Sequence, residues 1–262
     1  MNLTTPEKVI LITGASAGMG KETAISLAKE GHVVYGAARR LGNMQEIVDA
    51  GGYAIKMDVM DHDSIVNGVR EIVDNQGRID VLWNNAGYAI YGSVEDITID
   101  EARRQFEVNL FGLADLNKEV VPFMRNQGSG LIINTSSVGG KIYSPLGSWY
   151  HATKHALEGW SDCLRIEVKQ FGIDVVILEP GAIVTEFYDV MMDPMMERSK
   201  GGHYQKMAEG LKKANEDIHK KPDPSTSPAV IAKTVSKIIN ARKPKTRYAA
   251  GKLAKPMLFA RK

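Results

Sequence analysis

The chain opens with an apolar strand, a glycine-rich turn and a helix, in that order. Residues 8–13 hold four consecutive apolar residues, which is typical of a strand covered on both faces of a sheet. Residues 14–20 then hold three glycines spaced Gly-x3-Gly-x-Gly, and helical spacing of apolar side chains follows through residue 30. Glycine lets the backbone approach a ligand closely, and a helix N-terminus offers unpaired N–H groups to an anion. This segment therefore predicts a parallel sheet with an anion-binding turn at its edge.

The order of strand and then helix recurs along all 262 residues. Such alternation predicts parallel strands joined by right-handed crossovers, with helices on both faces of the sheet. We expect one α/β domain over residues 1–262, with a doubly wound sheet of seven parallel strands. The strands are expected near residues 8–13, 32–38, 53–57, 79–84, 130–136, 173–179 and 246–249, and the helices near 18–30, 61–75, 99–126, 149–171 and 228–241.

Residues 186–228 depart from this alternation. The segment holds five methionines and ends in a proline-containing loop at residues 221–225. Methionine is flexible and suits irregular apolar surfaces, so the segment could cover a bound substrate as a lid. The alternative is a simple pair of surface helices.

The composition of the chain does not indicate a particular class of binding partner. The formal net charge is +2, which gives no reason to expect nucleic-acid binding. No apolar stretch approaches the roughly 18 residues of a transmembrane helix, and no signal peptide opens the chain. The single cysteine, Cys163, excludes an internal disulfide and is expected to fill space in the core. The expected location is the cytoplasm.

The C-terminal part of the chain is basic. From Ala229 onward there are ten Lys or Arg residues and no Asp or Glu. Such a tail could face a membrane or a polyanion. The simpler interpretation is a last helix and strand with a solvated end, because Pro244 and Pro256 interrupt any long amphipathic helix.

Tyr150 and Lys154 stand four residues apart in a stretch of helical spacing. Positions four apart share a helix face, so the phenol and the ammonium should project into the same space. A neighbouring positive charge should lower the tyrosine pKa from about 10, which suits proton exchange with an alcohol or carbonyl oxygen. His151 and His155 are also four apart, but no third ligand stands at a readable spacing, so we predict no metal.

Taken in order, these motifs resemble those of the short-chain dehydrogenase/reductase family. The glycine turn after Thr13 resembles the cofactor signature of the family. Further matches are Asn84-Asn85-Ala86-Gly87, Asn109 before Leu110-Phe111-Gly112, Ser137 thirteen residues before Tyr150, and Pro180-Gly181 through Thr185. The resemblance covers about residues 7–250 and implies a single NAD(P)-binding Rossmann domain, with a substrate lid inserted at about residues 186–228.

The resemblance implies a catalytic tetrad of Asn109, Ser137, Tyr150 and Lys154. Tyr150 would exchange a proton with the substrate oxygen, and Ser137 would hydrogen-bond that oxygen and stabilise its developing charge. Lys154 would lower the tyrosine pKa and bind the ribose hydroxyls, while Asn109 would hold a water that links Lys154 to solvent. Ser136 is the alternative to Ser137, because neighbouring strand residues face opposite ways and only one can point at the substrate.

The end of the second strand predicts the choice of cofactor. NAD-preferring enzymes of this fold place an acid there to bind the ribose 2′-hydroxyl, whereas this chain has Ala38 followed by Arg39 and Arg40. Guanidinium groups suit a 2′-phosphate, so we expect NADP(H) in preference to NAD(H), unless both arginines are only solvated surface charges. The cofactor contacts implied by the resemblance are Gly14, Ser16, Ala17, Gly18, Met19, Gly20, Arg39, Arg40, Asp58, Val59, Asn85, Ala86, Gly87, Tyr150, Lys154, Pro180, Gly181, Ile183 and Thr185.

Apolar and aromatic residues near the catalytic motifs predict an apolar substrate pocket. Its expected lining is Tyr88, Ile90, Ile142, Tyr143, Trp149 and Phe187, although several of these could instead pack the core or an interface. Local sequence, such as residues 155–159, is similar to that of the retinol and 17β-hydroxysteroid dehydrogenase branch of the family. The implied substrate is a hydrophobic ketone, aldehyde or secondary alcohol.

The implied function is therefore NADP(H)-dependent hydride transfer, and two alternatives remain. One is reduction of a β-ketoacyl thioester on an acidic carrier protein, which would need a basic docking patch. The other is a non-catalytic NADP(H) sensor, which would be expected to lack catalytic side chains. A homodimer or homotetramer is also expected, because the helices near 99–126 and 149–171 pair across two-fold axes in the family, and Ala152, Ala156 and Gly159 permit close approach.

Overall fold

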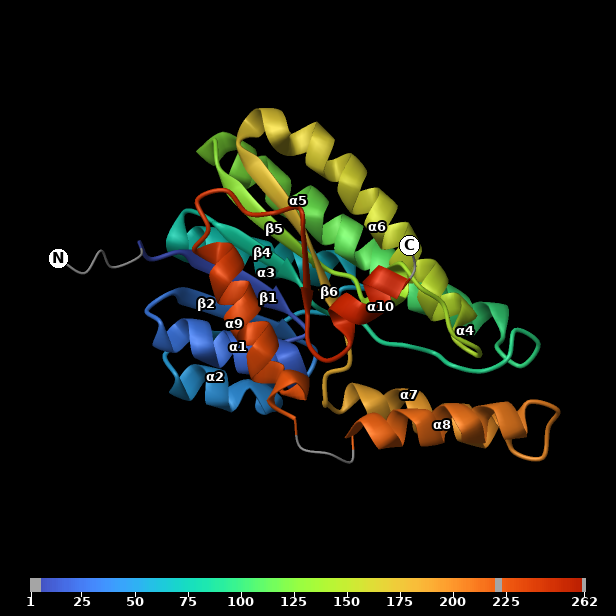
Figure 1. Cartoon of the computed structure of the whole chain (residues 1–262). Coiled ribbons are helices and arrows are strands. Elements are labelled where there is room, and N and C mark those ends of the chain that lie inside the picture. The colour runs from blue at the N-terminus through green and yellow to red at the C-terminus, as the bar shows by residue number, and fades with distance from the viewer. Residues whose placement is uncertain (1–5, 220–222, 261–262) are drawn as a thin grey trace.

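Seven parallel strands form one sheet, in the order β3-β2-β1-β4-β5-β6-β7 (Figure 1). The computed structural model describes residues 6–219 and 223–260. The strands are β1 (Val9–Thr13), β2 (Val33–Ala38), β3 (Tyr53–Lys56), β4 (Val81–Asn84), β5 (Gly130–Thr135), β6 (Ile173–Pro180) and β7 (Arg247–Ala250). The expected single-domain, doubly wound Rossmann fold is confirmed.

Strand β1 shows why the sheet needs helices on both faces. Its successive side chains point to opposite faces, so Ile10 and Ile12 lie in one buried apolar cluster, while Val9 and Leu11 lie in another. Figure 1 shows helical layers on the two sides of the sheet. The first cluster is completed by α1 (Gly18–Lys29), α9 (Pro228–Ile239) and the region of α2 (Gln45–Asp49), the second by α3 (His62–Gln76), α5 (Gly112–Gln127) and α6 (Ser148–Val168).

Local sequence sets the ends of several helices. The Asp61 carboxylate caps α3 by accepting the N–H of Ser64 at 3.2 Å, and Gly77 ends that helix with a left-handed backbone. A capping box between Thr98 and Glu101 begins α4 (Ile99–Phe106). These signals explain why the helices start and stop close to their expected positions.

The helix expected over residues 99–126 is not regular. Between α4 and α5 lies a π-helical turn, Glu107–Phe111, which carries Asn109. The residue after this turn is Gly112, where a Cβ would lie only 2.0 Å from the carbonyl oxygen of Val59. The π-turn and the glycine together let the helix pass close to the end of β3. Turns of this kind are frequent at functional sites.

The segment after β6 departs from alternation, as expected. It forms α7 (Phe187–Ser199) and α8 (Gln205–His219), a hairpin that stands apart from the two helical layers in Figure 1. Part of the expected proline-containing loop, residues 220–222, lies outside the described residues. After β7 the chain forms α10 (Ala254–Ala260), a helix that the sequence analysis did not predict.

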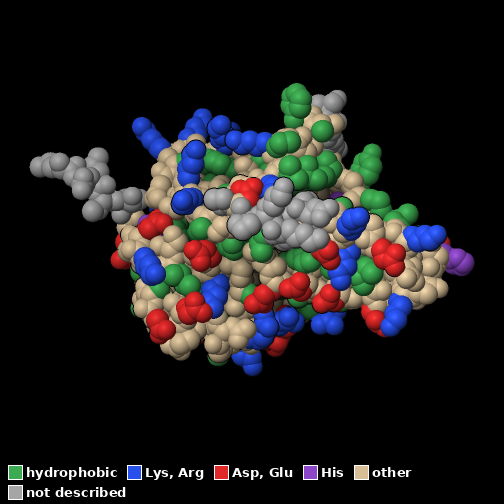
Figure 2. Space-filling model, turned by 60° about the horizontal axis from the view of Figure 1, so that its bottom comes forward, with side chains coloured by type: hydrophobic (Ala, Val, Ile, Leu, Met, Phe, Trp, Pro, Cys, Tyr) green, Lys and Arg blue, Asp and Glu red, His purple; other side chains and the backbone are tan. Residues whose placement is uncertain are grey.

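Figure 2 shows acidic and basic side chains mixed over the lower part of the face, while basic and hydrophobic side chains occupy its upper edge. Across the described parts of the chain, no helix combines the length and the apolar character needed to cross a bilayer.

Cys163 is exposed, so the expectation that it fills the core is wrong. It lies on the outer face of α6 with Gly159 and Ile166, which are also exposed.

Candidate active site

A cavity of about 660 Å³ opens at the carboxyl ends of the strands. Strand β1 has β2 on one side and β4 on the other, so the strand order reverses beside it. The crevice at such a switch point is where doubly wound sheets bind ligands. The cavity walls come from the turn after β1, the segments following β2 to β6, and parts of α4, α6 and α7.

The glycine turn after β1 forms one wall of this cavity. A Cβ on Gly14 would lie 2.8 Å from the Cα of Ala86, and one on Gly20 would lie 2.5 Å from the carbonyl oxygen of Gly14. Gly20 thus supports the turn from behind and does not line the cavity, unlike Ser16, Ala17, Gly18 and Met19. No side chain caps the N-terminus of α1, which leaves its N–H groups available to a pyrophosphate.

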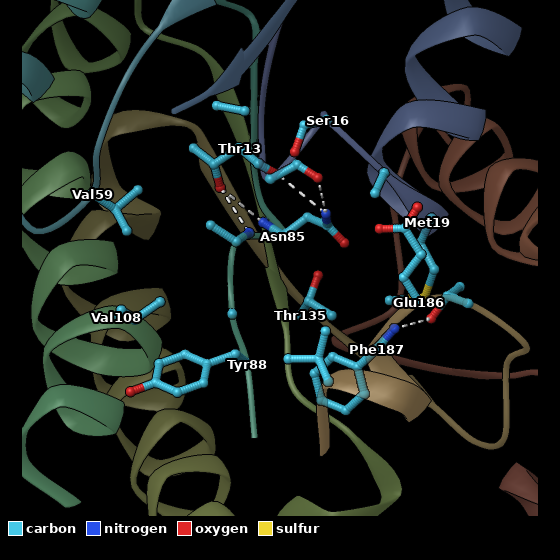
Figure 3. A pocket seen from close by; sticks show the side chains of 18 of the residues that line it. Thr13, Ser16, Met19, Val59, Asn85, Tyr88, Val108, Thr135, Glu186 and Phe187 are labelled. Carbon is cyan, nitrogen blue, oxygen red and sulfur yellow. Dashed lines mark hydrogen bonds between the residues drawn. The ribbon is translucent and has the colours of Figure 1, made fainter. Parts of the chain in front are cut away.

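Thr13 and Asn85 fasten the turn to the end of β4 (Figure 3). The Thr13 hydroxyl accepts the N–H groups of Asn85 and Ala86 at 3.1 and 3.0 Å. The Asn85 amide donates to the carbonyl oxygens of Thr13 and Gly14 at 3.1 and 3.4 Å. Among the residues that the structure describes, none donates to the buried Asn85 Oδ1. A buried acceptor on the cavity wall that lacks a partner fits a ligand that brings its own N–H or O–H group.

Arg39, Arg40, Asp58 and Val59 line the same cavity after β2 and β3. Both arginines are exposed, and within the described residues neither forms an ion pair. The carboxylate of Asp58 accepts the N–H of Met60 at 3.0 Å. Two guanidinium groups are therefore free at the end of β2, where the fold places the ribose of a dinucleotide.

Tyr150, Ser137 and Lys154 converge on the cavity. Lys154 Nζ lies 6.0 Å from the Tyr150 ring centroid and donates to the carbonyl oxygen of Thr135 at 2.8 Å. Ser137 Oγ accepts the N–H of Gly139 at 3.0 Å, and its hydroxyl slightly opposes the effect of burial on the Tyr150 pKa. The structure thus brings together the side chains that the spacing of the motifs had grouped.

Burial has the largest effect on the pKa values of Tyr150 and Lys154. It raises the pKa of the Tyr150 phenol above its usual value, and the nearby Tyr91 phenol adds to that rise. Burial also lowers the pKa of the Lys154 ammonium to about 8, with the Glu158 carboxylate opposing the shift. The expectation that Lys154 lowers the tyrosine pKa is wrong for the protein alone, because burial disfavours the charged forms of both side chains.

Asn109 lies behind the cavity wall and is buried. Its amide donates to the carbonyl oxygen of Tyr88 at 2.9 Å and to the Thr153 hydroxyl at 3.2 Å, and its Oδ1 accepts the N–H of Tyr88 at 3.1 Å. A Cβ on Gly87 would lie 3.1 Å from Asn109 Oδ1 and 3.8 Å from Lys154 Nζ. Asn109 therefore joins the π-turn to the loop after β4 and to α6, close to the lysine.

Three of the six residues expected to contact substrate line the cavity: Tyr88, Ile90 and Phe187. Phe187 lies beside Tyr150, with 6.2 Å between their ring centroids. The other three, Ile142, Tyr143 and Trp149, do not line it, which corrects the sequence-based expectation. Tyr143 is 86% exposed, on the same outward-turning loop as Ile142. Trp149 lies on another side of α6 and packs edge-on against Phe106 of α4.

The sequence analysis missed one face of α4 and the π-turn. Glu101, Arg104 and Val108 line the cavity, and their spacing of three and four residues is helical. Counting back from Asn109 by three or four residues reaches Phe106, Gln105 and Ala102, which lie on another face, so no motif in the sequence pointed to this one. Glu186 and Val190, around the start of α7, were also missed.

The α7–α8 hairpin packs over the substrate side of the site. Met192 and Met195 of α7 are buried in one cluster with Tyr91, Leu146 and Tyr150. Methionine side chains adapt readily to irregular apolar shapes. The packing around Tyr150 on the side of α7 is therefore apolar.

Polar contacts anchor the hairpin to the rest of the molecule. Arg198 of α7 donates to the carbonyl oxygen of Tyr91 at 2.7 Å and forms an ion pair with Glu101 of α4. The Tyr204 hydroxyl, just before α8, donates to the Glu95 carboxylate. These contacts hold the hairpin against the loop that follows β4.

Known proteins share both this sequence and this fold. Residues 8–194 match the family model of the short chain dehydrogenases. The 3-ketodihydrosphingosine reductase of Bacteroides thetaiotaomicron is 35% identical over 258 residues, which cover 97% of this chain and 91% of that protein. A short-chain dehydrogenase from Streptomyces avermitilis is 33% identical with a TM-score of 0.81, covering 97% of this chain and 92% of that one.

A more distant structure shares the fold alone. An alcohol dehydrogenase from Thermococcus sibiricus, complexed with 5-hydroxy-NADP, is 22% identical with a TM-score of 0.77, covering 95% of this chain and 98% of that one. The cavity and the family match together define a nicotinamide-dependent class of oxidoreductase. This chain belongs to the short-chain dehydrogenase/reductase family.

Proposed function

We propose that this protein is an NADP(H)-dependent oxidoreductase that interconverts a hydrophobic ketone or aldehyde and the corresponding alcohol. The observation that carries the proposal is the convergence of Tyr150, Ser137 and Lys154 on the cavity that the glycine turn also lines. The uncapped N-terminus of α1 and the free acceptor on Asn85 fit a dinucleotide in this cavity. A nicotinamide cofactor supplies or accepts the hydride when bound.

The side chains of the chain itself supply the proton and the positioning. Because its pKa is raised, Tyr150 stays protonated at neutral pH and can donate to the substrate oxygen as a carbonyl is reduced. Ser137 hydrogen-bonds the same oxygen and stabilises its developing negative charge. Lys154, whose pKa is about 8, can return a proton to Tyr150 and bind ribose hydroxyls. Asn109 holds the loop at Tyr88 and a water beside Lys154.

The preference for NADP(H) rests on Arg39 and Arg40. A guanidinium binds a phosphate through charge-assisted hydrogen bonds, whereas a ribose hydroxyl gains less from the same group. Ala38 provides no carboxylate to accept from that hydroxyl. The remaining cofactor contacts are those implied by the family motifs, with Gly20 acting through the shape of the turn.

An apolar carbonyl compound fits the substrate side of the cavity. Ile90, Phe187 and Tyr88 provide apolar and aromatic surface, and the buried methionines of α7 pack in one cluster with Tyr150 without lining the cavity. The Bacteroides relative is named for reduction of a ketone, which supports this class of substrate. In this proposal the segment at about residues 186–228 is a lid that excludes water from the site.

Steady-state kinetics with a panel of apolar ketones and aldehydes tests the proposal. We expect turnover with NADPH and a kcat/KM at least about tenfold lower with NADH. The two arginines should bind the charged 2′-phosphate more strongly than the neutral 2′-hydroxyl, by more than about 1.4 kcal/mol of interaction free energy. Binding of NADPH without turnover of any carbonyl or alcohol would instead favour the sensor. Competition by a free acyl-carrier protein would favour the thioester reductase.

We also propose that the protein assembles as a homodimer or homotetramer through the outer faces of α5 and α6. Small residues, Ala152 and Gly159, are exposed on α6, where Ile166 is 77% exposed, and Phe111 is 53% exposed just before α5. Light scattering should give at least twice the monomer mass at micromolar concentration. A monomer under those conditions would refute the assembly.

A further inference from the structure

A buried acidic pair lies behind the catalytic lysine. Glu158 follows Lys154 by four residues on α6, so the two side chains share a helix face. Glu179 approaches Glu158 from β6. The exposed fractions of Glu158 and Glu179 are 3% and 4%. Glutamates are almost never buried this completely unless another group compensates their charge.

Two cations face the pair, and both bind Glu158. Lys141 Nζ lies 2.8 Å from Glu158 Oε2, and Arg247 Nε donates to the same oxygen at 3.0 Å. Arg247 also donates to Asp162 at 2.6 Å. Glu179 is left with Arg247 Nε at 3.8 Å, which is too long for a hydrogen bond. Glu179 therefore lacks a cation of its own.

The second oxygen of Glu158 has no donor. Within the described residues Oε1 is buried without a hydrogen-bond partner, and Arg247 Nε, at 3.0 Å from Glu158 Oε2 and 3.8 Å from Glu179 Oε1, places the two carboxyl groups next to each other. Two adjacent carboxylates repel each other strongly away from water. One proton held between them removes that repulsion and gives Glu158 its missing donor. Burial, together with the negative charge of Glu158, raises the pKa of Glu179 to about 7.

Gly140 brings this pair close to the turn of α6 that carries Lys154. A Cβ at position 140 would lie 3.1 Å from both the Cγ of Glu158 and the carbonyl oxygen of Lys154, and 2.4 Å from Ser136 Oγ. Ser136 lines the cavity, and its Oγ is also buried without a partner. The acid pair and the cavity wall are thus in contact through one tightly packed polar region.

We propose that Glu158 and Glu179 share one proton and that the charge of this pair sets the protonation state of Lys154. When the shared proton leaves, the pair becomes doubly negative and favours the ammonium form of the lysine. The charge of Glu158 already opposes the effect of burial on the Lys154 pKa. Neither glutamate lines the cavity, so both are positioning residues that act through Lys154.

Four further charged groups belong to this cluster and must be distinguished from the pair. Lys141 follows the short helical turn after Ser137, Asp162 and Arg165 lie on α6, and Arg247 lies on β7. Asp162 is shared between Arg165 and Arg247, which lower its pKa against the opposing effect of burial. It is therefore a carboxylate throughout the neutral range and offers a matched control.

Infrared spectroscopy across about pH 5 to 9 tests the shared proton directly, because a protonated carboxyl group absorbs apart from carboxylates. We expect a protonated-carboxyl band that titrates near pH 7 in the wild type and in Asp162→Asn. The band should be absent at neutral pH in Glu179→Gln and in Glu158→Gln, where Arg247 becomes free to pair with Glu179. A wild type without the band, or a band that persists in both glutamine variants, would overturn the pair.

The pH dependence of turnover tests the coupling to Lys154, and this part rests on the proposed function. Glu158→Gln should lose the inflection near neutral pH and shift the alkaline limb down by about one unit, because Lys154 loses its nearest anion. Glu179→Gln should lose the neutral inflection and lower the alkaline limb by less than Glu158→Gln does, because Glu158 keeps its charge next to Lys154, and Asp162→Asn should keep both features of the wild type. Equal losses of rate in all three variants, without these shifts, would show a structural role only. If the wild type has no turnover, the proposed function fails while the infrared result still decides the shared proton.

Discussion

Arg39 and Arg40 determine the proposed cofactor preference at the scale of single residues. Both side chains are exposed at the cavity, and neither is held by an acid within the described chain. A free guanidinium can form a bidentate pair with a phosphate, but it gains little from a hydroxyl. The two arginines should therefore distinguish the cofactors by the 2′-phosphate, which NADP(H) carries and NAD(H) lacks.

Replacing both arginines, Arg39→Ser with Arg40→Ser, should weaken NADPH binding by about a hundredfold, because each charge-assisted contact contributes about 1.4 kcal/mol or more. NADH binding should change by less than about threefold. Fluorescence titration of the two cofactors measures both constants. Lys21→Ser is the control, because Lys21 pairs with Glu46 and does not line the cavity. Equal weakening for both cofactors would contradict the assignment.

Motif spacing predicted which side chains meet, but not how they ionise. The four-residue interval between Tyr150 and Lys154 correctly placed both at one cavity. The rise in the tyrosine pKa depends on burial by Tyr91 and by α7, which come from distant parts of the chain. Tyr143 was expected in the pocket for its aromatic character, yet the direction of a loop side chain is not encoded in its spacing from a motif.

The irregular helix from α4 to α5 positions the site at the scale of elements. Its π-turn carries Val108 on the cavity wall and Asn109 behind it. Gly112 lets the end of this turn touch the backbone at Val59, which also lines the cavity. Apolar periodicity indicated a helix here, but a single widened turn changes that pattern too little to be found in one sequence.

Gly112→Ala should displace this turn from Val59, because the added Cβ would lie 2.0 Å from a backbone oxygen. We expect the free energy of unfolding to fall by about 1–3 kcal/mol, and NADPH binding to weaken. Gly210→Ala in α8 is the matched control: nothing lies within 4 Å of its Cβ position, so helix propensity should stabilise it by up to about 1 kcal/mol. Urea unfolding and cofactor titration measure both effects. A Gly112→Ala protein as stable as the wild type would contradict the close approach.

At the scale of the whole molecule, one buried ionic cluster joins a helix that covers the sheet to two strands of the sheet. Helix α6 and strands β6 and β7 meet around Glu158, Glu179 and Arg247, so the catalytic helix and the last strand share one ionic cluster. Alternating strands and helices predicted the sheet and its layers. They could not predict this cluster, because its members lie as much as 106 positions apart, from Lys141 to Arg247.

Glu179→Gln should stabilise the protein at high pH. Folding raises the pKa of Glu179 from 4.5 to about 7. Between these pH values the folded protein keeps a proton that the unfolded chain releases, so the free energy of unfolding falls as the pH rises from 4.5 to 7. The free energy of unfolding of the variant should therefore exceed that of the wild type by about 2 kcal/mol at about pH 8, and the difference should vanish near pH 4.5. Urea unfolding at both pH values measures it. A difference that does not depend on pH would contradict the raised pKa.

We propose that Tyr150 transfers the proton during hydride transfer from NADPH. The most direct measurement is single-turnover reduction of a carbonyl substrate by Tyr150→Phe, with NADPH affinity measured on the same protein and Tyr91→Phe as a control for a lost buried hydroxyl. We predict a rate about 10²–10⁴-fold below that of the wild type, NADPH affinity within about threefold, and a much smaller loss of rate in the control. A Tyr150→Phe protein that retains the wild-type rate within tenfold would contradict the claim.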